Sequence, residues 1–314
     1  MFSIKQPNHI VIGNNSAHTF QYPNNSLVIT SKGAKSRGWI EYLDLGENVS
    51  VYDQVENNPS MDTVNKIIDK FSSFHFSCVI GLGGGSCLDV AKYVGYKLNI
   101  KKILIPTTFG SGSEVTKISV LKINGEKKSF HDDKLIADIA IEDSYFLENT
   151  PKTIFNNSVI DSCAQATEAY DSNNSNPYTK FLCKLAFEKL EYGIMNDDSE
   201  SIVLGSLYCG LGFGNASTTL GHALSYVYSN EGYSHGHALA HTTLMAHKFN
   251  NSIFYDRFEN IVKKLKFNKI FLKLDFDKAS EIILNDVKHL DNNPIIITKK
   301  DIKKILNDLR IMME

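Results

Sequence analysis

The sequence predicts an α/β amino-terminal domain built on a parallel sheet, followed by an all-helical carboxyl-terminal domain. Short apolar runs alternate with segments of helical periodicity in the first half, and two of these runs enter glycine-rich loops. Strand patterns disappear after about residue 150 and helical periodicity continues. We place the boundary at Asn149-Thr150-Pro151, where a proline follows a polar pair, which predicts domains at 1–149 and 150–314.

The first half supplies strands and helices in alternation. The run SLVIT (26–30) lies between PNN and SKG, which is typical of a buried strand that enters a loop. Residues 61–71 carry apolar side chains at helical spacing, and CVIGLGGGS (78–86) follows as strand and glycine loop. A helix is expected over 89–98 and a further strand over 101–108. This order implies crossover helices on a parallel sheet, whose ligands bind beyond the carboxyl ends of the strands.

The second half is expected to be helical. In KFLCKLAFEKLEYGI (180–194), Leu182, Leu185, Phe187 and Leu190 can line one face of a helix. Lysine and glutamate take the other face, as in a helix packed against a core.

Composition points to an ordinary soluble protein. Lys+Arg 33 against Asp+Glu 35 leaves a net charge of -2 with no long run of one sign, which argues against nucleic-acid and membrane-surface partners. The five cysteines are scattered and form no CxxC pair, which favours reduced thiols and a cytoplasmic location. The first residues lack the pattern of a signal peptide, and no run of about 18 apolar residues is present to cross a bilayer.

The stretch GLGGGSCLDVAK (81–92) has the features of a phosphate-binding loop. It lies between a predicted strand and a predicted helix, where free helix amides and bare glycines can approach a phosphate closely. Gly81, Gly83 and Ser86 only approximate the GxGxxG pattern, and no Gly-Lys-Ser/Thr of a Walker A loop follows. A plain tight turn fits the same residues.

A second loop, PTTFGSGSEVT (106–116), again follows a predicted strand. Thr107, Thr108, Ser111 and Ser113 offer hydrogen bonds, so two such loops at neighbouring strand ends can hold one extended ligand. The alternative is a turn that caps a helix, since the glutamate three residues after Ser111 is compatible with a capping box.

A third pattern suits a divalent metal. DSCAQ (161–165) supplies Asp161, and GHALSYVYSNEGYSHGHALAH (221–241) supplies His222 and His235 from other predicted helices. Carboxylate and imidazole are ligands that zinc and iron both accept. His237 and His241 lie one helical turn apart in the same stretch, and we expect them to be packing or surface histidines.

These stretches together resemble one enzyme family. GGGSCLDVAK, PTTFGSGSEVT, DSCAQATEAY and GHALSYVYSNEGYSHG, in this order, resemble the motifs of the iron-containing (group III) alcohol dehydrogenases, relatives of dehydroquinate synthase and glycerol dehydrogenase. The likeness runs from IVIGNNS (10–16) to DNNPIIITKKDIKKIL (291–306). It implies the dehydroquinate synthase-like fold, with a nucleotide-binding domain before a helical metal-binding domain.

The resemblance also assigns residues. The family's cofactor positions correspond to Gly83, Gly84, Gly85, Ser86, Asp89, Thr107, Thr108 and Ser111, and its metal positions to Asp161, Gln165, His222 and His235. The implied reaction is hydride transfer between NAD or NADP and a small alcohol or aldehyde, with Fe or Zn polarising the substrate oxygen. A phosphonate-type or other acidic aldehyde is our candidate substrate, on family analogy alone. Family members commonly form homodimers or larger homo-oligomers.

The chain departs from the family pattern at three positions. Gln165 stands where the family has a histidine, which predicts weaker metal binding or a shift toward ions that accept oxygen ligands. Tyr226 replaces a further family histidine, and its phenol, with an ordinary pKa of about 10, is a poorer base near neutrality. Ser31 and Lys32 follow the first cofactor strand where many members carry an aspartate, so we expect NADPH to be accepted.

A rival hypothesis follows from these departures. The chain is several tens of residues shorter than typical members, with most of the loss expected after Asn250. Together with Gln165 and Tyr226, this is compatible with a catalytically impaired nucleotide-binding homologue that has no metal-dependent turnover.

Overall fold

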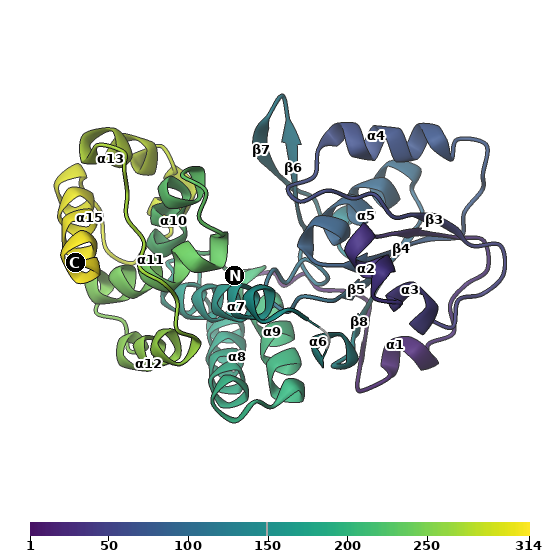
Figure 1. The fold of residues 1–314 in the computed structure, drawn as a ribbon, viewed down its shortest axis with the longest axis horizontal. Helices are drawn as coiled ribbons and strands as arrows, with labels where there is room; N and C mark the ends of the chain where they lie inside the picture. The colour runs from purple at the N-terminus through teal and green to yellow at the C-terminus, as the bar shows by residue number, and fades with distance from the viewer. Residues whose placement is uncertain (149) are drawn as a thin grey trace. The chain divides into compact units, whose positions relative to one another are not determined.

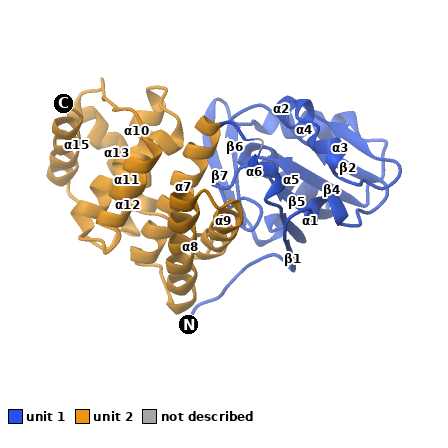
Figure 2. Cartoon of the chain, turned by 60° about the horizontal axis from the view of Figure 1, so that its bottom comes forward, with its two compact units in different colours: residues 1–151 blue, residues 152–314 orange. Residues whose placement is uncertain are grey.

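A six-stranded sheet forms the centre of the amino-terminal unit in this computed structural model, which describes residues 1–148 and 150–314 (Figure 1). The chain divides into unit 1, Met1–Pro151, and unit 2, Lys152–Glu314 (Figure 2). Asn149, at which the first domain was predicted to end, lies outside the described residues. Unit 1 contains the parallel sheet and unit 2 is helical, so the predicted fold class is confirmed.

The sheet has the strand order β1-β8-β5-β4-β2-β3, and all its neighbouring strands are parallel. All six residues of β4 are buried, as expected where helices cover both faces of a parallel sheet. Gly83 pairs with Pro106 at the carboxyl ends of β4 and β5, so the two predicted loops leave the same edge side by side. The strands of the sheet are β1 His9–Ile12, β2 Ser26–Ile29, β3 Ser50–Tyr52, β4 Cys78–Gly83, β5 Lys101–Pro106 and β8 Ile139–Glu142.

Helix α5 follows the first loop and packs on β4 and β5, while α4 packs on α5. The helix predicted over 61–71 is confirmed as α4, whose N-cap Ser60 accepts a hydrogen bond from the Thr63 N–H at 3.2 Å. Val64 and Ile67 of α4 are fully buried in the core of unit 1. The helices of unit 1 are α1 Ser16–Thr19, α2 Lys32–Ser36, α3 Trp39–Tyr42, α4 Met61–Lys70, α5 Gly85–Leu98, the 3₁₀ turn η1 Asp133–Leu135 and α6 Tyr145–Glu148.

An antiparallel hairpin interrupts the expected alternation of strands and helices. It consists of β6 Ile118–Ile123 and β7 Glu126–His131. Asn124 and Gly125 form its turn with φ of 53° and 83°, the conformation that an Asn-Gly pair favours between twisted strands. The chain enters β6 from the second loop, so the alternative in which Ser111 and the following glutamate cap a helix is wrong.

Unit 2 consists of helices, and no strand is assigned among its described residues. The helix predicted around 180–194 is α8, which starts with a capping box between Asn176 and Thr179. No helix in the described part of the chain is long and apolar enough to cross a membrane. The helices of unit 2 are α7 Lys152–Asp171, α8 Pro177–Asn196, α9 Ser199–Phe213, α10 Leu220–Asn230, α11 His235–Asn250, α12 Tyr255–Leu265, α13 Phe276–Leu284, α14 Val287–Asp291 and α15 Lys299–Met313.

Candidate functional site

Three side chains of metal-ligating type converge in unit 2 from three helices. Asp161 lies on α7, His222 near the start of α10, and His235 is the first residue of α11. His222 Nε2 lies 3.6 Å and His235 Nε2 3.9 Å from Asp161 Oδ1. One ligand atom from each residue lies within 4.8 Å of the other two. One carboxylate and two imidazoles at this spacing fit a divalent ion such as zinc or iron.

Glu168, which is not among the predicted site residues, orients His222. Its carboxylate is 1% exposed and makes a close contact with His222 Nδ1. It also accepts hydrogen bonds from the Gly221 N–H and, at 3.1 Å, from Thr219 Oγ1. Metal-binding histidines commonly donate their second ring N–H to such a carboxylate, which fixes the tautomer and leaves the other nitrogen for the metal.

The carboxylates around His222 also set its proton affinity. Burial disfavours the charged imidazole, but Glu168 and Asp161 outweigh burial and raise the pKa of His222 to about 9. Burial likewise opposes ionisation of Glu168, yet nearby imidazoles hold the pKa of its carboxyl below the ordinary value. The metal-free cluster therefore contains an ionised Glu168–His222 pair, and a bound cation would displace the proton from His222.

A glycine allows α10 to come this close to α7 and α11. A Cβ atom at Gly221 would lie 2.5 Å from Glu168 Oε1 and 2.9 Å from the Thr243 Cα. Both distances are too short for a real Cβ contact, so a larger residue would push α10 away from the Glu168 carboxylate. Gly221, which directly precedes His222, therefore allows the His222 imidazole to contact the Glu168 carboxylate.

Gln165, the predicted fourth ligand, uses both ends of its amide within the protein. Its Nε2 donates to Asp161 Oδ1 at 2.9 Å, and its Oε1 accepts from Cys209 Sγ at 3.7 Å. The nitrogen of the amide, and not the oxygen, therefore faces the cluster. Coordination by Gln165 stays a prediction, and the observed contacts favour a role in holding the Asp161 carboxylate.

Tyr226 lies one helical turn after His222, beside the cluster. Its ring centre is 6.3 Å from that of His235, and the two planes differ by 20°. Although 39% of Tyr226 is exposed, desolvation of its phenol and the carboxylates of Asp286, Asp161 and Glu168 raise the pKa of this group above its ordinary value. Near neutrality Tyr226 is therefore an O–H donor and not a base.

His237 and His241 do not join the cluster. The Nε2 atoms of both rings contact the Asn268 carbonyl oxygen, at 2.7 Å and 2.9 Å. Neither belongs to the group of Asp161, His222 and His235, in line with the expectation that they are packing or surface histidines.

The two predicted nucleotide loops touch each other in unit 1. A Cβ atom at Gly84 would lie 2.9 Å from Thr108 Oγ1, and one at Gly85 would lie 2.8 Å from Ser111 Oγ. Gly84 is the N-cap of α5, so the first N–H groups of this helix have no partner within the helix and can bind a phosphate. The loops thus meet as the neighbouring strand ends predict, and the hydroxyls of Thr108 and Ser111 lie beside a half-buried helix start.

Other predicted cofactor residues lie around this helix start. Gly83 ends β4 and its carbonyl accepts the Thr107 N–H at 3.0 Å. Ser86 is half-buried on the first turn of α5. Ser31 is the N-cap of α2 and its Oγ accepts the Ala34 N–H at 3.2 Å.

Asp89 faces into the protein and not toward the loops' outer surface. Its carboxylate accepts from Ser113 Oγ at 2.6 Å and from the Val120 N–H at 2.9 Å, and it lies 3.2 Å from the fully buried Lys92 Nζ. These contacts tie α5 to the second loop and to β6. Direct contact between Asp89 and a cofactor stays a prediction, whereas the structure places it as a support for the second loop.

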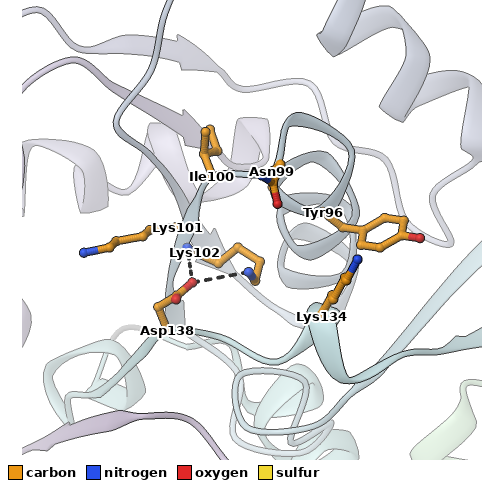
Figure 3. Close-up of a pocket in the computed structure, with 8 residues that line it drawn as sticks. Tyr96, Asn99, Ile100, Lys101, Lys102, Lys134 and Asp138 are labelled. Carbon is orange, nitrogen blue, oxygen red and sulfur yellow. Dashed lines mark hydrogen bonds and ion pairs between the residues drawn. The ribbon is translucent and has the colours of Figure 1, made fainter.

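A cavity of about 260 Å³ lies elsewhere in unit 1, where α5 ends and β5 begins (Figure 3). Lys102 crosses it to Asp138, whose Oδ2 accepts from the Lys102 N–H at 2.8 Å and lies 3.2 Å from Nζ. None of the predicted site residues lines it. Its lining consists of Gly95, Tyr96, Asn99, Ile100, Lys101, Lys102, Lys134 and Asp138.

Comparison with protein families gives two matches that together cover most of the chain. Residues 7–144 match the family described as iron-containing alcohol dehydrogenase. Residues 155–283 match the carboxyl-terminal part of the Fe-containing alcohol dehydrogenase family. The first match contains both loops, and the second contains Asp161, His222 and His235.

Individual relatives match over part of their length. A 4-hydroxybutyrate dehydrogenase of Clostridium kluyveri is 36% identical over 209 residues, which cover 57% of this chain and 56% of the relative. A sulfoacetaldehyde reductase of Bilophila wadsworthia is 30% identical over 202 residues, covering 55% of this chain and 52% of the relative. The chain thus matches about half the length of these relatives.

Solved structures agree in fold. The sulfoacetaldehyde reductase of Bifidobacterium kashiwanohense in complex with NAD+ has a TM-score of 0.88 at 22% identity, covering 98% of both chains. A 1,3-propanediol oxidoreductase has a TM-score of 0.87 at 20% identity, covering 98% of this chain and 100% of the other.

Proposed function

Because the chain belongs to the iron-containing alcohol dehydrogenase family, we propose that it is a metal-dependent, NAD(P)-linked oxidoreductase that interconverts an alcohol and an aldehyde. The observation that carries this proposal is the cluster of Asp161, His222 and His235, with Glu168 behind His222. A solvated surface cluster would not need a buried carboxylate that fixes one histidine tautomer.

The residues of unit 2 would hold the metal and handle the substrate oxygen. A divalent iron or zinc ion would act as a Lewis acid toward that oxygen. Asp161, His222 and His235 supply one charged and two neutral ligands, and Glu168 keeps His222 in the tautomer that presents Nε2. Tyr226, as a neutral phenol, can donate a hydrogen bond near the cluster.

The residues of unit 1 would hold the dinucleotide. The amides at the start of α5, with Gly84 and Gly85 leaving room, suit the diphosphate. Thr108 and Ser111 can donate hydrogen bonds from the second loop. NAD or NADP would supply or accept the hydride.

The cofactor is proposed to include NADP as well as NAD. Lys32 is exposed as the first residue of α2, directly after the N-cap Ser31 and close to the carboxyl end of β2. A cation there suits the additional phosphate of NADP and removes the acid that often binds the ribose hydroxyls.

The substrate is proposed to be a small, acidic aldehyde. The names of two relatives refer to 4-hydroxybutyrate and sulfoacetaldehyde, and both molecules carry an acid group. A phosphonate-type aldehyde belongs to the same chemical class.

The five thiols are buried and no disulfide joins them, which supports a cytoplasmic, reducing environment. We also propose a homodimer or larger assembly, which light scattering after gel filtration would test.

Reconstitution tests the proposed reaction. The metal-free protein is supplied with Fe²⁺ or Zn²⁺ and a panel of carboxylate, sulfonate and phosphonate aldehydes, and the absorbance of NADH or NADPH is followed. We expect metal-dependent oxidation of the cofactor that Asp161→Ala abolishes and that His237→Ala leaves intact. No turnover with any aldehyde, metal or cofactor would reject the proposal.

The second candidate is a nucleotide-binding homologue without turnover. The Gln165 amide, whose nitrogen faces Asp161, is the observation that favours it. Tight NADH binding combined with no metal by elemental analysis and no oxidation of cofactor would support this candidate over the enzyme.

A further inference from the structure

A second carboxylate–histidine pair lies next to the metal cluster. His289 of α14 directs Nδ1 at both carboxylate oxygens of Asp286, each at 2.7 Å. The two side chains are mostly buried, at 12% and 18% exposure. The His289 ring centre lies 6.1 Å from that of His222 and 6.0 Å from that of Tyr226. His289 is therefore a neighbour of the proposed site, and no other part of the proposed mechanism uses it.

This pair repeats the arrangement of Glu168 and His222. In both pairs Nδ1 contacts a carboxylate, so Nε2 is the nitrogen left to bind something else. The two imidazole planes differ by only 18°. In metal-binding histidines, a carboxylate that contacts the ring nitrogen not used for the metal orients the ring and raises its basicity.

From this arrangement, and on the premise of the proposed function, we infer that His289 is the fourth protein ligand of the metal. It supplies from α14 the imidazole that Gln165 does not supply from α7. Gln165 is already engaged by Asp161 and Cys209 through the two ends of its amide. The ligand set then consists of one carboxylate and three imidazoles.

The spacing of the rings is close to what this set requires. An imidazole nitrogen binds zinc at about 2.0–2.1 Å, so the ring centres of two imidazoles on one tetrahedral ion lie about 5 Å apart. The ring centre of His235 lies 5.4 Å from that of His222, close to this spacing, and the ring centre of His289 lies somewhat beyond it at 6.1 Å. The three ligand atoms that lie within 4.8 Å of one another come from Asp161, His222 and His235. His289 is not in this group, so its ring has to move toward the ion to bind it. Helix α14 has only five residues, none of them fully buried, and Leu290 packs against the core of unit 2.

Metal titration of the metal-free protein tests the inference without any substrate. Zn²⁺ affinity is measured by calorimetry against a competing chelator, and Co²⁺ is added as a spectroscopic probe of the ligand field. His289→Ala is expected to weaken Zn²⁺ binding on the order of 100-fold or more and to alter the Co²⁺ absorption bands, while Asp286→Asn is expected to weaken it about 10–100-fold. His237→Ala, which removes an imidazole held by a backbone carbonyl, is expected to leave both unchanged.

The outcomes separate the two proposals. If the unaltered protein binds no Zn²⁺ or Co²⁺, the proposed metal-dependent function fails and this inference fails with it. If it binds both ions and His289→Ala binds them equally well with the same Co²⁺ spectrum, only the ligand role of His289 is refuted. Should His289→Ala lower the melting temperature of the metal-free protein, His289→Phe decides, because it keeps a ring and removes the nitrogen. Unchanged affinity in His289→Phe refutes the ligand role.

Discussion

Asparagine in place of Asp89 is expected to destabilise unit 1 strongly. The Asp89 carboxylate accepts from Ser113 Oγ and the Val120 N–H and faces the ammonium of Lys92, which is 0% exposed. An asparagine has nearly the same shape but brings two N–H donors into a site whose other groups are donors. It also removes the carboxylate that pairs with Lys92, although the more distant Glu114 carboxyl still interacts with this cation.

The magnitude follows from the burial of the pair. Removing one partner of a buried ion pair costs about 3–5 kcal/mol, because the remaining charge stays desolvated. Burial lowers the pKa of Lys92 and Asp89 opposes that shift, so Lys92 can lose its proton in the variant and limit the cost. We therefore expect about 3 kcal/mol, which is a large part of the roughly 5–15 kcal/mol that stabilises a typical domain. With a urea m-value of about 2 kcal/mol/M, the unfolding midpoint should fall by about 1.5 M.

The single tryptophan provides the assay. Trp39 lies in unit 1 and is 4% exposed, so its emission in a urea titration reports the unfolding of that unit. Asp69→Asn, an exposed change on α4, serves as the control and should shift stability by less than about 0.5 kcal/mol. The double variant Asp89→Asn with Lys92→Met should recover part of the loss. If the urea midpoint of Asp89→Asn falls no further than that of the Asp69→Asn control, the supporting role of Asp89 is refuted and direct contact with the cofactor is favoured.

Three further substitutions test other parts of the molecule. Glu168→Gln should weaken Zn²⁺ binding about 10–100-fold, since His222 loses the carboxylate that orients it; equal affinity in a chelator competition would contradict this. Lys32→Asp should lower the ratio of kcat/KM for NADPH to that for NADH about tenfold or more, whereas an unchanged ratio would show that Lys32 only faces solvent. Burial lowers the pKa of His247 to about 4 against a partly opposing Glu168. Burial of the neutral His247 ring therefore contributes its full stabilisation above the ordinary pKa of about 6.5. This contribution, up to about 3 kcal/mol, is lost as the pH falls from there through about 4. Urea midpoints between pH 7 and 4.5 should therefore fall less in His247→Gln than in the unaltered protein, and parallel declines would refute this assignment.

The parallel sheet and both glycine loops could be predicted because their signals are local. An apolar run of strand length followed by glycines marks a buried strand and its loop without knowledge of the rest of the fold. The β6–β7 hairpin carried an equally local signal in Asn124-Gly125, yet an alternating strand–helix reading overlooks it. Glu168 also had a local signal, because it stands two helical turns after Asp161 on the same face of α7.

Contacts between side chains that lie far apart in the sequence are not marked by any local sequence pattern. The sequence by itself determined the fold class and the two loops, and the resemblance of its motifs to one family singled out Asp161, His222 and His235 as candidate metal ligands. Only the tertiary structure decided that Asp89 turns inward, that the Gln165 amide presents its nitrogen to Asp161, and that α14 brings His289 to the cluster. The physical reason is that side-chain partners are chosen by helix packing over long sequence separations, and no local periodicity encodes them.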